Sequence, residues 1–138
     1  GVTTGRLGNH VFYLLLMAVR AYQSGYQPKQ EALGLSAMEA RCLIVLSDLP
    51  GISAEELTTH THINSTVAEV NEALPYLESL GLVMAAGGSY SLTKEGLDKA
   101  DEYWSIASSH AKDVLDHFDD EQITAFKHVL RSIIKYGA

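Results

Sequence analysis

The chain has 138 residues, 46% of them hydrophobic, which suits one domain with a sizeable core. Its longest apolar run, from Val11 to Val19, is much shorter than the ~20 residues that a membrane span needs, and no cleavage-like site follows it. A single cysteine excludes an internal disulfide. From the length we expect one domain, and from the lack of a membrane span and of a disulfide we expect a cytoplasmic protein.

The charges are unevenly distributed along the chain. Acidic residues outnumber basic ones by 17 to 10, and no Lys or Arg occurs from Cys42 to Thr93. The same stretch carries six acidic residues: Asp48, Glu55, Glu56, Glu69, Glu72 and Glu78. A nucleic-acid-binding surface in this stretch would lack the cations that normally contact phosphates.

The chain begins with a pattern typical of an amphipathic helix, from about Leu7 to Gln27. Gly25 and Pro28 are poor helix continuers, so we expect the helix to end near them.

Three short helices are predicted next. The sequences Ser36-Ala37-Met38-Glu39 and Ser53-Ala54-Glu55-Glu56 are capping boxes that each open a helix. Asn64 or Ser65 is expected to cap the third helix, whose apolar positions recur at spacings of three and four residues. Short helices with a tight turn between the last two predict a helix-turn-helix.

A hairpin and two longer helices complete the pattern. Gly87-Gly88 lies between two short apolar runs and predicts a tight turn, so the hairpin would form a wing. A long helix is expected from Thr93, and Asp119 or Asp120 is expected to cap the last one. The fold class is therefore mainly α with a small β-wing.

Three motifs give the chain a resemblance to the MarR family of winged-helix transcriptional regulators. They are Leu35-Ser36 leading into Leu43 and Leu46, Leu77-Glu78-Ser79-Leu80-Gly81-Leu82-Val83, and Leu92-Thr93-Lys94-Glu95-Gly96. The resemblance implies a homodimer in which residues of about 1–34 and 97–138 form a dimerisation region and about 35–96 form the winged helix-turn-helix. It also implies that the helix after Asn64 enters the major groove of DNA.

The sequence departs from the family pattern at three places. Glu69 stands where a basic residue is usual, and Glu72 adds a second carboxylate one turn later. The wing has only eight residues between Val83 and Leu92 and lacks the usual Asp-x-Arg-Arg. Pro75 interrupts the backbone hydrogen bonds of the recognition helix.

Two functions follow from the resemblance and the departures. In the first, double-stranded DNA is bound by Asn64, Ser65, Thr66, Ala68, Glu69 and Glu72, with Arg41 and Lys94 at the flanks. In the alternative, the winged helix-turn-helix has lost ordinary DNA binding, and the protein acts through protein–protein or effector binding.

The resemblance also implies a crevice for a small aromatic effector. The candidate residues are His10, Tyr13, Met17, Arg20, Tyr103 and Trp104, because aromatic side chains with a cation suit an aromatic carboxylate. The alternative is that this aromatic stripe is part of the core.

Other reactive side chains have simpler structural interpretations. Two sets have metal-ligand spacing, namely Glu56 with His60 and His62, and His110 with Asp113 and His117, but we expect neither a metal nor a cofactor. We expect Cys42 to be a buried hydrophobe rather than a peroxide sensor. Neither a phosphate-binding glycine loop nor a nucleophile with an identifiable base is present, so we expect no enzyme.

Overall fold

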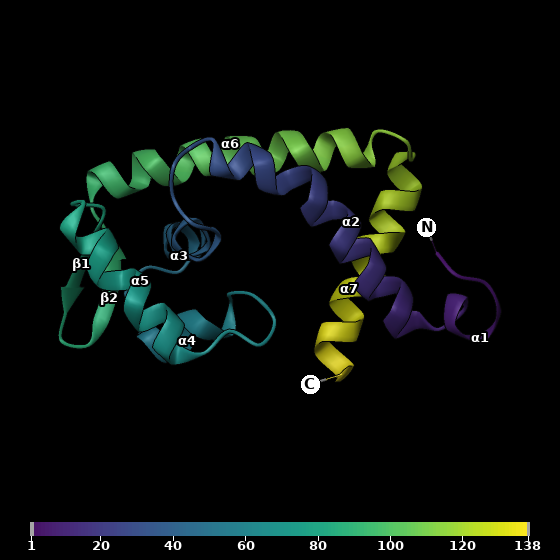
Figure 1. Ribbon diagram of the computed structural model, residues 1–138, viewed down its shortest axis with the longest axis horizontal. Coiled ribbons are helices and arrows are strands. Elements are labelled where there is room, and N and C mark those ends of the chain that lie inside the picture. The colour runs from purple at the N-terminus through teal and green to yellow at the C-terminus, as the bar shows by residue number, and fades with distance from the viewer. Residues whose placement is uncertain (1, 138) are drawn as a thin grey trace. The chain divides into compact units, whose positions relative to one another are not determined.

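The computed structural model describes residues 2–137 of the chain. Its contacts divide the molecule into two compact units, one ending at Ala107 and the other beginning at Ser108. Figure 1 shows a chain made mainly of helices with one small hairpin, as the sequence predicts. Within the described residues, no helix combines the length and apolar character that crossing a bilayer requires.

The first helical segment is longer than the sequence predicts and is divided in two. A short helix α1 (Gly5–Gly8) is followed by α2 (Val11–Glu31), with His10 accepting a hydrogen bond from the backbone of Phe12 at the N-cap. The expected end near Gln27 is wrong, since α2 continues through Pro28. Proline removes only its own amide donor, and the Pro28 carbonyl still accepts from Ala32, at 3.2 Å.

The predicted helix-turn-helix is formed by α3 (Ala37–Asp48), α4 (Ala54–Thr59) and α5 (Val67–Ser79). The capping box of Ser36 is present with both of its hydrogen bonds, and the Ser53 hydroxyl accepts from the Glu56 amide. The expected cap of α5 is wrong, because Thr66 holds that position rather than Asn64 or Ser65. Asn64 has a left-handed φ of 65°, so the chain is still turning at this point and the helix begins later.

The predicted wing is an antiparallel hairpin of β1 (Val83–Ala86) and β2 (Ser89–Leu92). Gly87 and Gly88 both have positive φ, as a tight turn between such strands requires. Tyr90 also exchanges backbone hydrogen bonds with Gly51 and Ile52, at 2.9 and 2.8 Å. The hairpin is thereby fixed to the segment that leads into α4.

The last two helices are α6 (Lys94–Leu115) and α7 (Asp120–Gly137). The Thr93 hydroxyl accepts from the Gly96 amide at 3.0 Å and caps α6. The Asp119 carboxylate accepts from the Gln122 amide at 2.8 Å, while Asp119 donates its own amide to the Gln122 side chain. Asp119 is therefore the cap of α7, one of the two residues predicted for that position.

The buried core of the first unit is formed by side chains of α3, α4, α5, α6 and the hairpin. The largest fully buried side chains are Tyr103, Leu43, Leu46, Leu57, Leu74, Leu77, Val70 and Cys42. Cys42 is thus a buried side chain, as predicted. Burial, together with the nearby Glu39 carboxylate, raises its pKa to about 12, which keeps the thiol protonated.

Two of the motifs meet at the junction between α5, the wing and α6. Thr93 donates its hydroxyl to the Gly81 carbonyl at 2.6 Å and its amide to the Leu82 carbonyl at 3.1 Å. Gly96 packs so closely on the same Leu82 carbonyl that a Cβ would overlap it. The glycine is therefore needed for a close approach of two backbones, which holds the end of α5 against the start of α6.

Candidate nucleic-acid interface

The helix predicted to read DNA has one buried and one exposed face. Val70, Ala73, Leu74 and Leu77 face the core. The exposed face carries the predicted residues Ala68, Glu69 and Glu72, together with Asn71, Pro75 and Tyr76, which are not among the predicted DNA-binding residues. Asn71 lies one turn beyond Ala68, so helical spacing alone would have found it, and its amide suits the edge of adenine.

The start of α5 holds three more of the predicted residues. Asn64 and Thr66 are exposed, whereas Ser65 is half-buried and donates its amide to the His62 carbonyl at 3.1 Å. Thr66 and Glu69 form a capping box with two reciprocal hydrogen bonds. The carboxylate at the unusual acidic position is thus a structural part of the helix N-terminus.

Glu69 and Glu72 also border a shallow hollow between the starts of α3 and α5. Its other lining residues are Ser36, Met38, Glu39 and Ala73. Three carboxylates therefore surround one hollow, which favours a positively charged neighbour over a phosphate.

The two cations that border the acidic stretch lie in different settings. Arg41 donates its Nε hydrogen to the carbonyl oxygen of His60 at 3.0 Å, so α3 is tied to the end of α4. Lys94, which is exposed like Arg41, is the first residue of α6. All six acidic residues between Cys42 and Thr93 are exposed, so the surface of the head is acidic.

The two histidines of the α4–α5 turn differ in exposure. His60 is the exposed C-cap of α4, whereas His62 is half-buried. Burial and the Arg41 charge lower the pKa of His62, and the Glu69 carboxylate opposes them. Among residues 2–137, no group of three or more His, Cys, Asp or Glu side chains is arranged to hold a metal ion.

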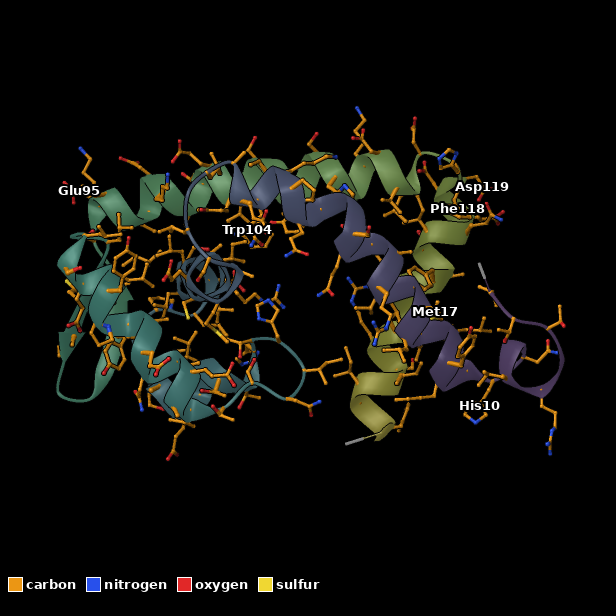
Figure 2. The ribbon with its side chains drawn as sticks, viewed as in Figure 1. His10, Met17, Glu95, Trp104, Phe118 and Asp119 are labelled. Carbon is orange, nitrogen blue, oxygen red and sulfur yellow. The ribbon has the colours of Figure 1, made fainter. Side chains whose placement is uncertain are left out.

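The predicted effector residues fall into two groups within the first unit. Figure 2 shows Trp104 directed toward α3, where its indole donates to the Ser47 hydroxyl at 2.8 Å. Tyr103 is fully buried, which raises its pKa, and its hydroxyl accepts from the Leu35 amide at 3.1 Å. These two residues of α6 therefore contact the segment after α2 and the helix α3.

The other effector candidates follow one another along α2. His10 is its N-cap, Tyr13 and Met17 are half-buried, and Arg20 is exposed. About 30 Å of helix lies between His10 and the segment that Tyr103 contacts, at ~1.5 Å per residue. A single chain therefore does not bring His10 and Tyr103 into one site, and Figure 2 shows His10 well away from Trp104, the neighbour of Tyr103.

Several solved structures resemble this arrangement over nearly its whole length. The MarR family protein Rv2887 of Mycobacterium tuberculosis, in complex with DNA, is 28% identical, covers 90% of this chain and 97% of its own, and has a TM-score of 0.76. The same protein in complex with salicylic acid is 27% identical, with coverages of 90% and 98% and a TM-score of 0.74.

A further structure agrees in fold. The MarR family transcriptional regulator SPO1453 of Silicibacter pomeroyi DSS-3 is 20% identical, covers 98% of this chain and 100% of its own, and has a TM-score of 0.86. No protein-family model matches the sequence. The chain has the winged-helix fold of MarR family transcriptional regulators and is similar in sequence to Rv2887, while its helix α5 is atypically acidic and its wing is short.

Proposed function

We propose that the chain is a dimeric, cytoplasmic DNA-binding transcriptional regulator that responds to a small ligand and has no catalytic activity. The observation that carries this proposal is the exposed face of α5, which follows α4 in a winged helix similar to that of a protein solved on DNA. Asn64, Ser65, Thr66, Ala68, Glu69 and Glu72 are the proposed DNA-facing residues, with Arg41 and Lys94 at the flanks.

In the proposed complex, the protein contacts DNA mainly through uncharged hydrogen-bond donors. Hydroxyls, amides and the N-terminus of α5 can donate to phosphates and base edges without a net positive charge. Because few counterions would be released, the affinity should fall only shallowly with added salt. We expect specificity to come from the fit of two recognition helices in successive major grooves.

The dimer is supported by apolar side chains that the chain leaves exposed. On α2 these include Val11, Phe12, Leu14, Leu16 and Val19, at 38–69% exposure. On α7 they are Phe126, Val129, Ile133, Ile134 and Tyr136, at 43–77%. Faces of this kind mark contacts with another molecule. We propose that a second copy covers them, with about 1–34 and 97–138 as the dimerisation region and 35–96 as the winged head.

The proposed ligand is an aromatic carboxylate, since Rv2887 has been solved with salicylic acid. Arg20 would supply the cation and Tyr13 an aromatic surface, while Tyr103 and Trp104 lie at the head. His10 and Tyr103 are separated in one chain, so a site that included both would draw on both copies of the dimer. Calorimetry with a panel of phenolic acids, repeated on Arg20→Gln, tests this site.

The proposed function is tested by selecting duplexes from a random pool with the full chain and measuring affinity for the selected sequence. We expect enrichment of a palindrome and binding at low salt. A lack of enrichment and of binding, even at low salt, would exclude the proposal.

A second candidate function is favoured by the charge of the head. The stretch from Cys42 to Thr93 has no Lys or Arg, and its six acidic residues are all exposed. Such a surface suits a basic protein partner better than a phosphate backbone. A chain that binds no duplex but retains its dimer and its ligand would support this alternative.

A further inference from the structure

Arg41 lies at the point where the helix-turn-helix changes direction. It belongs to α3, and its Nε hydrogen bonds to the carbonyl oxygen of His60, the C-cap of α4, at 3.0 Å. The last carbonyl groups of a helix lack partners within the helix, and a cation placed there is also favoured by the helix dipole. The Arg41 guanidinium therefore supplies a hydrogen-bond donor to the carbonyl group at the C-terminal end of α4.

Apart from Arg41, the end of α4 is held by hydrogen bonds within its own turn, among them one from the Thr61 hydroxyl to the Thr58 carbonyl at 2.7 Å. The helix has six residues, and only Leu57 is buried among them. The segment that follows is compact but short, with Thr61 donating to the Thr58 carbonyl at 3.1 Å and Ser65 to the His62 carbonyl at 3.1 Å. Without an anchor from α3, this segment would be stabilised mainly by its own backbone hydrogen bonds.

The charge of Arg41 also acts on both sides of α3. Burial lowers the pKa of His62 in the α4–α5 turn, and the Arg41 charge lowers it further. Burial and Tyr22 raise the pKa of Tyr26 on α2, and the Arg41 charge opposes them. The guanidinium thus lies close to the turn and within electrostatic reach of α2. The side chain of Arg41 is exposed, and its Nε is directed to the turn.

We infer that Arg41 is a positioning residue, which fixes the α4–α5 turn through the His60 carbonyl and so sets where the recognition helix α5 begins. This inference rests on the proposed function and assigns Arg41 a different task from the phosphate contact that its sequence position suggests. Arg41 acts on DNA through α5, whose first turn Thr66 and Glu69 cap.

The test compares two substitutions of this residue. Arg41→Lys keeps the positive charge but loses the planar Nε donor, whereas Arg41→Gln loses the charge as well. Lys94→Gln is the matched control, since it removes an exposed cation at the other border of the acidic stretch. Amide hydrogen exchange, the NMR titration of His62, and DNA affinity across a salt series are measured for all four chains.

We expect the Thr61 and Ser65 amides to exchange roughly tenfold faster in both Arg41 variants and at the normal rate in Lys94→Gln, as loss of a hydrogen bond to a charged donor implies. The pKa of His62 should rise in Arg41→Gln and stay low in Arg41→Lys. Both Arg41 variants should bind the selected duplex less tightly, with the slope of log affinity against log salt unchanged.

A phosphate contact would give a different pattern. Arg41→Lys would then keep its affinity, and Arg41→Gln would lower the salt slope by about one unit with unchanged amide exchange. Either result would overturn the inference. If the unsubstituted chain binds no duplex, the proposed function fails, while amide exchange and the His62 titration still decide whether Arg41 holds the turn.

Discussion

Thr66 and Glu69 exchange hydrogen bonds across the first turn of the recognition helix. The Glu69 amide donates to the Thr66 hydroxyl at 3.2 Å, and the Glu69 carboxylate accepts from the Thr66 amide at 3.3 Å and from its hydroxyl at 3.1 Å. The negative charge that departs from the family pattern therefore stabilises the start of α5. The same charge lies on the surface proposed to face DNA, so stability and affinity should respond differently to its removal.

Glu69→Gln separates the two effects, because glutamine can keep both partners of a capping box while it removes the charge. We expect the free energy of unfolding to change by less than ~0.5 kcal/mol. DNA affinity should rise severalfold, since a repulsive charge leaves the surface. Chemical denaturation and fluorescence anisotropy measure the two quantities. Weaker DNA binding would instead show that the carboxylate accepts a hydrogen bond from a base.

Thr66→Ala tests the hydrogen bond that the Thr66 hydroxyl accepts in the capping box of α5. The variant loses the side chain that accepts from the Glu69 amide, and we expect a cost of about 1 kcal/mol in the free energy of unfolding. Thr66→Ser is the control, because it keeps the hydroxyl. Equal stability of the alanine and serine variants would contradict the role given to this cap.

Gly96→Ala should destabilise the head strongly. Its Cβ would overlap the Leu82 carbonyl, a rigid backbone group that also accepts the Thr93 amide. We expect a loss of about 1–3 kcal/mol or more in thermal or denaturant unfolding. Glu95→Gln, an exposed change in the same turn, should leave stability within ~0.5 kcal/mol. A stable Gly96→Ala variant would show that this close approach can relax.

Cys42 should be unreactive in the folded protein. Its side chain is buried, and its pKa is raised to about 12, so thiolate is scarce at neutral pH. A raised pKa favours the thiol form, so the associated stability is complete below the unfolded pKa of ~8.5 and is lost as pH rises beyond it. Thiol labelling at mildly alkaline pH should follow unfolding. Labelling at the rate of a free cysteine under native conditions would contradict this account.

The proposed dimer can be weakened on α7. Phe126 is 51% exposed in the single chain, and Phe126→Glu would place a carboxylate in the proposed interface. We expect sedimentation to shift from dimer to monomer at micromolar concentration. Lys127→Glu, on the adjacent exposed position, should leave the dimer intact. Monomeric behaviour of the unsubstituted chain would contradict the proposal itself.

The sequence predicts those parts of the fold that depend on local chemistry. The capping boxes at Ser36 and Ser53, the glycine turn of the wing and the Asp119 cap all place hydrogen-bonding groups within a few residues of one another. The errors occur where local signals compete. The sequence predicts that α2 ends near Pro28, but one missing donor does not outweigh the rest of the helix.

The candidate site is less predictable because its contacts join residues distant in sequence. Arg41 and His60 are separated by 19 positions, and Trp104 and Ser47 by 57, so neither hydrogen bond has a local signature. The separation of His10 from Tyr103 depends on the length of α2, which the sequence underestimated. Asn71, by contrast, follows from helical spacing and should join the residues tested for base contacts.

An acidic winged head that binds DNA largely through neutral donors should show a weak salt dependence, measured as the affinity for a selected duplex across a salt series. We predict a palindrome with half-sites ~10 base pairs apart and a log–log salt slope much shallower than the approximately −10 of lac repressor. A slope of about −10, or absence of selection together with no binding at low salt, would exclude binding through neutral donors.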